Sequence, residues 1–341
     1  MRWQIPRDAS AGPAARMLLA RFPALADPAA TPLAERFAAG EIVDHRGRAR
    51  AAGELVGPGD ELWFHRELRP EAVPTDPLPI LFRDEHLLVI DKPHDVATMP
   101  RGAHVLSSAL VRLRRTTGIE HLVPLHRLDR RTAGVLAFGV RPEERSAYQQ
   151  LFARREVDKF YEALVLPGPG CSLPSAAGER AELADRMEKR RGELTARLVP
   201  GEPNALTELE VLAVHVTGEG GAREDGTVER GRAVGGRAEG GPSEDEPSGA
   251  GALLLGLRPR TGRTHQLRLQ LSSRGAPIAG EDLYPEPCAE PEGLLQLLAR
   301  TLAFTDPVTG QAREFRSGTS LAALDSAAER RISPQRPRAA G

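Results

Sequence analysis

The sequence has few of the features that mark secreted, metal-binding or membrane proteins. Its 341 residues include only two cysteines, Cys171 and Cys288, which are too few for a disulfide framework and suggest no metal cluster by their spacing. No apolar run approaches a membrane span, and the N-terminus leads into no apolar segment of a secretory signal. We therefore expect a cytoplasmic protein with no membrane association and no bound metal.

Acidic and basic residues almost cancel, because the formal net charge is only -1. Their distribution along the chain is uneven. Residues 101–160 hold twelve Arg or Lys against six acidic residues, and residues 258–274 hold five Arg and no acidic residue. Residues 217–250 reverse this balance, with eight acidic residues against four Arg. The segments that look folded are thus basic, which suits a nucleic-acid partner better than the net charge suggests.

The length suits one large domain and one small domain. We predict a small α/β domain over residues 1–70, a Pro-rich linker over 71–79, a main domain over 80–320 and a flexible tail over 321–341. Residues 217–250 contain ten glycines and almost no large apolar group. They bury too little surface to offset their chain entropy, so we expect a disordered insertion there.

Strand and helix patterns alternate irregularly along the chain, without a strict βαβ rhythm. This favours an α+β protein with a mixed, largely antiparallel central sheet and flanking helices. Strands are expected at 41–44, 61–64, 80–82, 87–90, 135–138, 159–166, 192–199, 205–216 and 252–257, and helices at 14–40 and 142–156.

A first candidate for chemistry is the segment His126-Arg127-Leu128-Asp129-Arg130-Arg131-Thr132-Ala133-Gly134. The arginines beside Asp129 favour its ionised form. An isolated acid of this kind is usually part of a surface turn, bonded to nearby backbone N–H groups. The basic setting just before an apolar strand makes a functional carboxylate the stronger interpretation.

Two further segments lie beyond the first. In residues 260–268, Thr264 suits the start of a helix that ends at Gly275, whereas the alternation of Leu267, Leu269 and Leu271 favours a strand. No His or Cys lies at ligand spacing from His265, so metal binding is not expected. In residues 159–165, strand alternation places Tyr161 on the face opposite Phe160, and a lone tyrosine there is usually a core residue.

Together and in this order, the three segments resemble the RluA-like family of RNA pseudouridine synthases. The family's signature around its catalytic aspartate is similar to residues 126–134, and its Gly-Arg-Thr-His-Gln-(Ile/Leu)-Arg signature is similar to residues 262–268. The likeness covers about residues 80–316 apart from the insertion. Residues 1–70 resemble a degenerate form of the small RNA-binding domain, shared with a ribosomal protein, that often precedes this catalytic domain. The chain departs from the pattern at Ala133, Glu281 and Asp306.

The resemblance implies isomerisation of uridine to pseudouridine in ribosomal or transfer RNA, with no cofactor, by a protein expected to be a monomer. It implies that Asp129 is the catalytic carboxylate, that Tyr161 stacks on the uracil or assists proton removal at C5, and that Arg268 pairs with Asp129. A helix over 264–275 would favour that pairing and is preferred for this reason. The expected RNA contacts are Arg127, which fills the space of the everted base, and His126, Lys159, Arg263 and His265.

Three other interpretations remain. The chain could be an inactive RNA-binding protein on the same scaffold, which would bind RNA without making pseudouridine. It could be a glycosidase, which would need a second carboxylate such as Asp91 or Asp282 across the substrate. The least favoured is a structural domain with an Arg-rich surface.

Overall fold

The computed structural model describes residues 1–28, 30–65, 71–102, 104–190, 192–215 and 251–321. The predicted insertion at 217–250 and almost all of the predicted tail lie outside these residues. The chain divides into two compact units. The first comprises Met1–Pro74 and Arg101–Leu106, and the second comprises Thr75–Pro100 and Ser107–Gly341. No helix in the described residues is long and apolar enough to cross a membrane.

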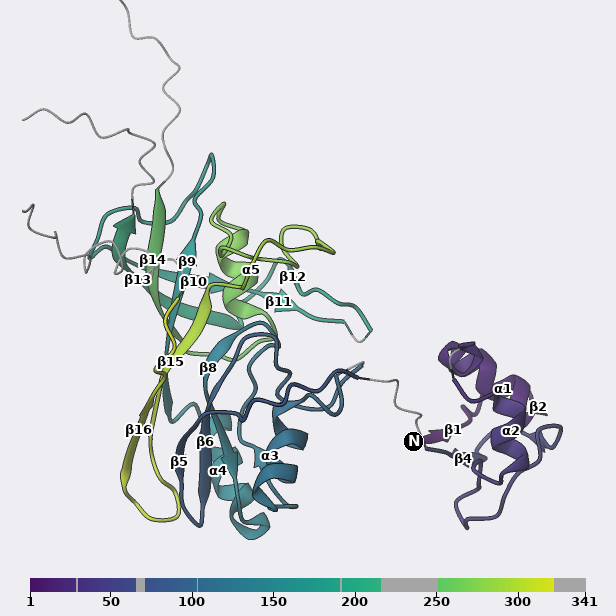
Figure 1. The fold of residues 1–341 in the computed structure, drawn as a ribbon. Coiled ribbons are helices and arrows are strands. Elements are labelled where there is room, and N and C mark those ends of the chain that lie inside the picture. Colours follow the sequence, from purple (N-terminus) through teal and green to yellow (C-terminus); the bar gives the residue numbers. More distant parts are fainter. Residues whose placement is uncertain (29, 66–70, 103, 191, 216–250, 322–341) are drawn as a thin grey trace, which may run out of the picture. The chain divides into compact units, whose positions relative to one another are not determined.

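The first unit is a small α/β body (Figure 1). Its helices lie within the predicted range of 14–40, and two short antiparallel strand pairs join them. The helices are α1 (Ala14–Arg21), the 3₁₀ turn Pro23–Ala26 and α2 (Leu33–Ala38), and the paired strands are β1 (Arg2–Gln4) with β4 (Glu61–Trp63) and β2 (Gly12–Pro13) with β3 (Leu55–Val56). The strand predicted at 41–44 is wrong except for two isolated bridges that Val43 forms, one with Ala49 and one with Trp63. The Asp44 carboxylate accepts the backbone N–H groups of Arg46 and Arg48, which turns the chain at this point.

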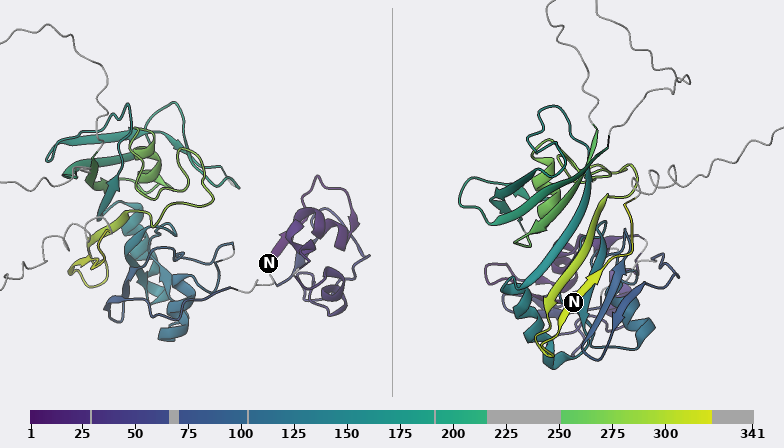
Figure 2. Two further views of the ribbon diagram at one scale, coloured as in Figure 1. Left: turned by 45° about the horizontal axis from the view of Figure 1, so that its top comes forward. Right: turned by 90° about the vertical axis from the view of Figure 1, so that its left-hand side faces the viewer.

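The second unit is built on a ten-stranded sheet with the order β10-β13-β14-β9-β15-β8-β6-β5, while β16 pairs with β15 and β7 with β8. Among the described ladders of this sheet, only that between β15 and β8 is parallel, so the predicted fold class is confirmed. Its strands are β5 (Ile80–Arg83), β6 (Leu87–Lys92), β7 (Val123–Pro124), β8 (Ala133–Gly139), β9 (Val157–Val165), β10 (Arg180–Asp185), β13 (Ala205–His215), β14 (Ala252–Pro259), β15 (Leu297–Thr305) and β16 (Ala312–Arg316). The long strands β9 and β15 run side by side (Figure 2).

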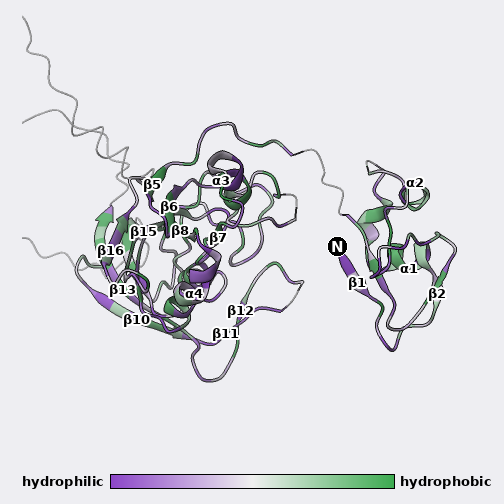
Figure 3. Ribbon diagram, turned by 90° about the horizontal axis from the view of Figure 1, so that it is seen from below, coloured by the Kyte–Doolittle hydropathy of each residue, from purple (hydrophilic) through white to green (hydrophobic). Residues whose placement is uncertain are grey.

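Strands β6 and β8 are buried at every residue, because helices cover both of their faces. On one face Ile90 and Phe138 pack with Leu113 of α3 (Ala109–Thr117). On the other face Val89 and Val135 pack with side chains of α4 (Arg145–Ala153), which follows the 3₁₀ turn Pro142–Glu144. Both strands are coloured as largely hydrophobic in Figure 3. The two-sided apolar core fixes the strand that leads out of the Asp129 loop.

The helix preferred over residues 264–275 is confirmed in kind, as α5 (Gln266–Ser272). The predicted cap at Thr264 is wrong, because His265 precedes the helix and no side chain caps it. Residues 266–271 are all buried. Hydrogen bonds to Thr207 of β13 satisfy the side-chain amides of the buried Gln266 and Gln270. Polar and apolar residues of this helix are buried alike. The alternation of Leu267, Leu269 and Leu271 therefore does not indicate a strand with one buried and one exposed face.

The strand predicted at 192–199 is wrong over most of its length. Only β12 (Arg197–Leu198) is extended, and it pairs with β11 (Met187–Glu188). The Glu193 N–H bonds to the Arg190 carbonyl, and Gly192 has a φ of +94°. This turn breaks the extended run that the sequence suggested.

Candidate active site

Asp129 lies in the loop between β7 and β8. The Thr132 N–H donates to the Asp129 carbonyl at 3.1 Å and closes a turn. From this turn β8 runs directly into the buried centre of the sheet, whereas the Asp129 side chain keeps 26% exposure. The carboxylate therefore lies in a loop anchored by a buried strand and remains partly accessible to a substrate.

Buried donors hold the backbone on both sides of Asp129. The Lys92 ammonium is fully buried, and burial lowers its pKa to about 7, a shift that the Asp129 charge opposes. Its acceptors are the carbonyl oxygens of Pro93, Val96 and Arg130, at 2.8, 2.9 and 3.1 Å. The Thr98 hydroxyl donates to the Leu128 carbonyl and accepts the Leu128 N–H. These bonds leave the loop little freedom to move.

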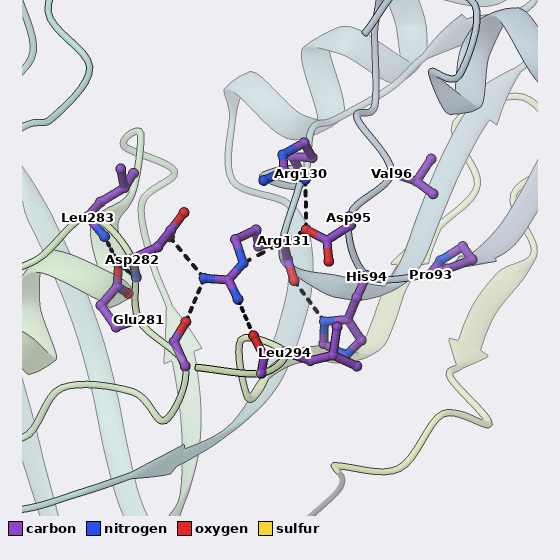
Figure 4. Close-up of polar contacts among 12 residues, drawn as sticks. Pro93, His94, Asp95, Val96, Arg130, Arg131, Glu281, Asp282, Leu283 and Leu294 are labelled. Atoms are coloured by element: carbon purple, nitrogen blue, oxygen red, sulfur yellow. Dashed lines mark hydrogen bonds and ion pairs between the residues drawn. The ribbon is translucent and has the colours of Figure 1, made fainter. Parts of the chain in front are cut away.

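Arg131 ties this loop to the segment that follows α5 (Figure 4). Its side chain is 5% exposed and donates to the carbonyls of Gly280 at 2.6 Å and Gly293 at 2.5 Å. It also forms an ion pair with Asp282 at 3.3 Å. Behind it, the His94 Nδ1 donates to the Arg131 carbonyl at 2.8 Å. Arg131 is thus a structural cross-link rather than a free basic side chain.

All eight predicted site residues line one cleft of about 940 Å³ in the second unit, and they are His126, Arg127, Asp129, Lys159, Tyr161, Arg263, His265 and Arg268. Seven Arg or Lys residues line this cleft, against the acids Asp129 and Asp158. The lining therefore favours a polyanion. In the described residues, no group of three or more His, Cys, Asp or Glu is placed to hold a metal.

Tyr161 reaches the cleft from β9. Its ring is half-buried. It packs against two apolar clusters, one that contains Leu257 and another that contains Phe138. Burial raises the pKa of the phenol, and the Asp129 charge raises it further. Tyr161 therefore keeps its proton at neutral pH and can act as a hydrogen-bond donor.

The expected pairing of Arg268 with Asp129 is wrong in this structure. Arg268 is 3% exposed, its Nε donates to Glu281 Oε2 at 2.8 Å, and its Nη2 contacts both Glu281 and Asp282. Within the described residues no ion pair joins Arg268 to Asp129. Burial alone would lower the pKa of Arg268, but its bond to Glu281 and the surrounding negative charges raise it. The physical reason is that two nearer acids, one of them the buried Glu281, take up Nε and Nη2 of the guanidinium, although the charge of Asp129 still contributes to the raised pKa of Arg268.

His126 braces the strand rather than offering a positive charge. Its Nε2 accepts the Ala137 N–H of β8 at 3.2 Å, and its ring stacks on Phe152 with centroids 5.1 Å apart. Burial, together with the Lys159 charge, lowers the pKa of His126 to about 3. The ring is therefore neutral at pH 7. In contrast, Arg127 and Arg263 are exposed on the cleft.

Three important residues were not identified as site residues from the sequence. Lys92 lies outside the motifs that pointed to the site, and Arg131 is only one of several arginines beside Asp129 in the sequence. Tyr284 places its hydroxyl oxygen 2.9 Å from His265 Nδ1. Lysine is scarce in this chain and Lys92 lies at the end of an apolar strand, which is the one signal that pointed to a buried role.

Known proteins that are similar to this chain are RNA pseudouridine synthases. Residues 86–273 match the family model described as RNA pseudouridylate synthase. The dual-specificity RNA pseudouridine synthase RluA of Pasteurella multocida is 30% identical over 69% of this chain and 91% of its own. Its counterpart in Haemophilus influenzae is 29% identical over 71% of this chain and 94% of its own. The tRNA pseudouridine synthase C of Vibrio cholerae is 26% identical over 71% and 91%.

The matched region contains the Asp129 loop, Tyr161 and α5, which are the elements that build the cleft. Because the family model matches more than half of the chain and the relatives named above are similar over most of their length, the chain belongs to the RNA pseudouridylate synthase family, in its RluA-like branch.

Proposed function

We propose that this chain isomerises uridines to pseudouridine in structured ribosomal or transfer RNA, with Asp129 as the catalytic carboxylate. The observation that carries the proposal is that Asp129, Tyr161 and Arg268 line one basic cleft. The reaction breaks the N1–C1′ bond, turns the uracil and joins C5 to C1′, while a proton leaves C5 and another binds N1. No group or electron is supplied from outside, so the reaction needs no cofactor.

The proposed roles are those that the family resemblance implies, and the position of each side chain in the cleft supports them. Asp129 acts on the ribose, either as a nucleophile at carbon or as a base. Tyr161, which remains protonated, stacks on the everted uracil or assists transfer of the C5 proton. Arg127 is exposed, and no polar partner is recorded for it within the described residues, so its guanidinium is available to brace the space that the base vacates.

The charge of the cleft lining supports RNA as the substrate class. Exposed arginines along its lining suit the phosphates of a folded RNA. Loop bases are the ones most easily everted, so we propose a stem-loop as the substrate. The names of the relatives include a tRNA pseudouridine synthase and a ribosomal large subunit pseudouridine synthase, which supports either RNA as the source. We expect the protein to act on that RNA in the cytoplasm, as a monomer.

The test is a site-resolved map of pseudouridine in total RNA from cells with and without this protein. Cells that express Asp129→Asn at the wild-type level serve as the control. We expect at least one ribosomal or transfer RNA site to disappear on deletion, to return with the wild-type protein and to stay absent with Asp129→Asn. A map that is unchanged by deletion would contradict the proposal.

A further inference from the structure

We propose that His265 is a positioning residue for Asp129, held by the Tyr284 hydroxyl as the neutral tautomer with its proton on Nε2. This role rests on the proposed function, because it assigns His265 a task in the reaction that Asp129 performs. It differs from the direct RNA contact that the sequence suggested for His265. In this arrangement the imidazole is a protein group that orients the carboxylate, in addition to the charge of Arg268 nearby.

The geometry places the imidazole between a phenol and a carboxylate. His265 lies directly before α5 in the left-handed region, with a φ of +57°, and its side chain is 12% exposed. Its Nδ1 lies 2.9 Å from the Tyr284 hydroxyl oxygen, and its Nε2 lies 3.9 Å from Asp129 Oδ1. A non-glycine residue in this conformation is uncommon and is often found at functional sites.

Hydrogen-bond accounting at Tyr284 fixes the tautomer. The Tyr284 oxygen accepts the Ala196 N–H at 2.8 Å, and the residue is only 5% exposed. Within the described residues, His265 Nδ1 is the only recorded acceptor for the hydroxyl proton. A buried hydroxyl without an acceptor costs about 1–3 kcal/mol. Tyr284 therefore donates to Nδ1, and a neutral imidazole must then carry its proton on Nε2.

The surrounding charges support a neutral ring. Burial lowers the pKa of His265, and the positive charges of Arg268 and Lys189 lower it further. The negative charges of Asp129 and Glu281 oppose this shift. A neutral ring with Nε2–H toward Asp129 can orient the carboxylate without protonating it.

The separation of 3.9 Å is longer than a hydrogen bond. Catalytic hydrogen bonds are often long in the absence of substrate and tighten only in the complex. A contact from Nε2–H to Oδ1 would hold that oxygen in place and leave Oδ2 to face the ribose. Such an orienting contact acts on the rate of the chemical step more than on the affinity for RNA.

A double-mutant cycle separates this role from a structural one. Tyr284→Phe removes the hydroxyl and keeps the ring packing. His265→Asn removes Nε2–H, and asparagine tolerates a left-handed backbone. With saturating RNA that carries the mapped uridine, we expect each single variant to slow single-turnover conversion about 10-fold or more, with Kd for RNA changed less than about 3-fold. Because Tyr284 acts through His265, the double variant should be no slower than His265→Asn.

Tyr148→Phe is a matched control, because that buried phenol bonds to Asp306 and does not line the cleft. It should lower stability and leave the rate unchanged. Effects of Tyr284→Phe and His265→Asn that multiply in the double variant would overturn the proposal.

A spectroscopic measurement tests the tautomer without any activity. In ¹⁵N-labelled protein at pH 7, the His265 ring is assigned by its loss in His265→Asn. We expect the Nε2–H tautomer in the wild type and a shift toward a mixture in Tyr284→Phe. An Nδ1–H tautomer or an imidazolium in the wild type would refute the proposal. A wild-type protein that shows the expected tautomer but makes no pseudouridine would instead overturn the proposed function.

Discussion

The two long motifs line the same cleft, yet the fold holds them in opposite ways. The segment 126–134 is fixed through its backbone by Lys92 and Thr98, which leaves the Asp129 side chain 26% exposed. The segment 262–268 ends in Arg268, whose side chain is buried and paired with two acids. The acid is thus accessible from the cleft, whereas the arginine is paired with acids within the protein.

The difference shows how a site can be both rigid and reactive. Backbone bonds position a loop without consuming the charge of its side chain. Side-chain ion pairs position a helix but use up the charge, and their burial costs desolvation energy. Substitutions that act on one motif and spare the other can separate these two kinds of constraint.

The largest effect should come from the glycine that ends the first motif. A Cβ at Gly134 would lie 2.2 Å from the Ala299 carbonyl oxygen, and φ there is +112°. The atoms that this Cβ would meet belong to the backbone of Ala299 and cannot move aside as a side chain could. Gly134→Ala should therefore destabilise the fold by more than about 4 kcal/mol or prevent folding. Gly262→Ala, in the second motif, is the control, since its nearest neighbour is Lys159 Nζ at 4.0 Å. Urea unfolding of both variants checks this, and equal losses would contradict the packing described.

The next effect concerns the side-chain pairs of the second motif. Glu281→Gln removes a carboxylate that is 3% exposed and leaves Arg268 with Asp282 alone. We expect a loss of about 3 kcal/mol, because a buried charge loses most of its compensation. The matched control is Glu208→Gln, which breaks an exposed pair with Arg260 and should cost less than about 1 kcal/mol. A loss in Glu281→Gln no larger than in the control would mean that Arg268 is not held as described.

A smaller effect should appear in how the free energy of unfolding depends on pH, through His126 of the first motif. The pKa of His126 is about 3 in the folded protein, against about 6.5 when unfolded, so the unfolded chain binds more protons between these pH values. Stability should therefore fall as the pH drops through this window, by up to about 1.4 kcal/mol per pH unit from this group. His126→Gln cannot titrate, although its amide oxygen can still accept the Ala137 N–H. Urea unfolding at a series of pH values from 8 to 5 gives the free energy of unfolding as a function of pH. This free energy should fall less steeply with decreasing pH in the variant than in the wild type, and identical slopes would rule out this assignment.

The smallest expected effect is on RNA affinity. Arg263 is exposed on the cleft, and its Nε donates to the Asn204 carbonyl at 3.1 Å. We expect Arg263→Ala to weaken RNA binding by about 1 kcal/mol and to reduce the slope of log K against log salt by about 1. Arg316→Ala, which removes an exposed arginine that does not line the cleft, should change neither quantity. If both variants behave alike, phosphate binding is not concentrated at the cleft.

The sequence predicted the fold class and the membership of the cleft because those depend on local patterns. Apolar strands such as Val135–Phe138 and a paired set of signatures are visible in one dimension. The residues 266–272 were harder, because Gln266 and Gln270 are buried polar groups whose partners on β13 lie about 60 positions away. Periodicity cannot distinguish a helix that is buried all round from a strand.

The detailed contacts of the site could not be predicted for a similar reason. The sequence offers Arg268 either Asp129 or the acids that follow Gly280 as partners. Only the three-dimensional path of the chain after Gly280 brings Glu281 nearer to Arg268 than Asp129. The link from Ala196 through Tyr284 to His265 joins three segments that are far apart in the sequence, and only the segment of His265 carries a recognisable motif. Which partner a long charged side chain selects depends on packing, which the sequence does not display.

The central claim is that Asp129 drives the exchange of the C5 and N1 attachments of uracil. The most direct measurement is release of tritium to water from RNA labelled at uracil C5, using purified wild-type protein and Asp129→Asn. We predict release by the wild type that matches the pseudouridine formed, and a rate at least about 10⁴-fold lower for Asp129→Asn with RNA binding retained. Comparable release by the two proteins would contradict the assignment of Asp129.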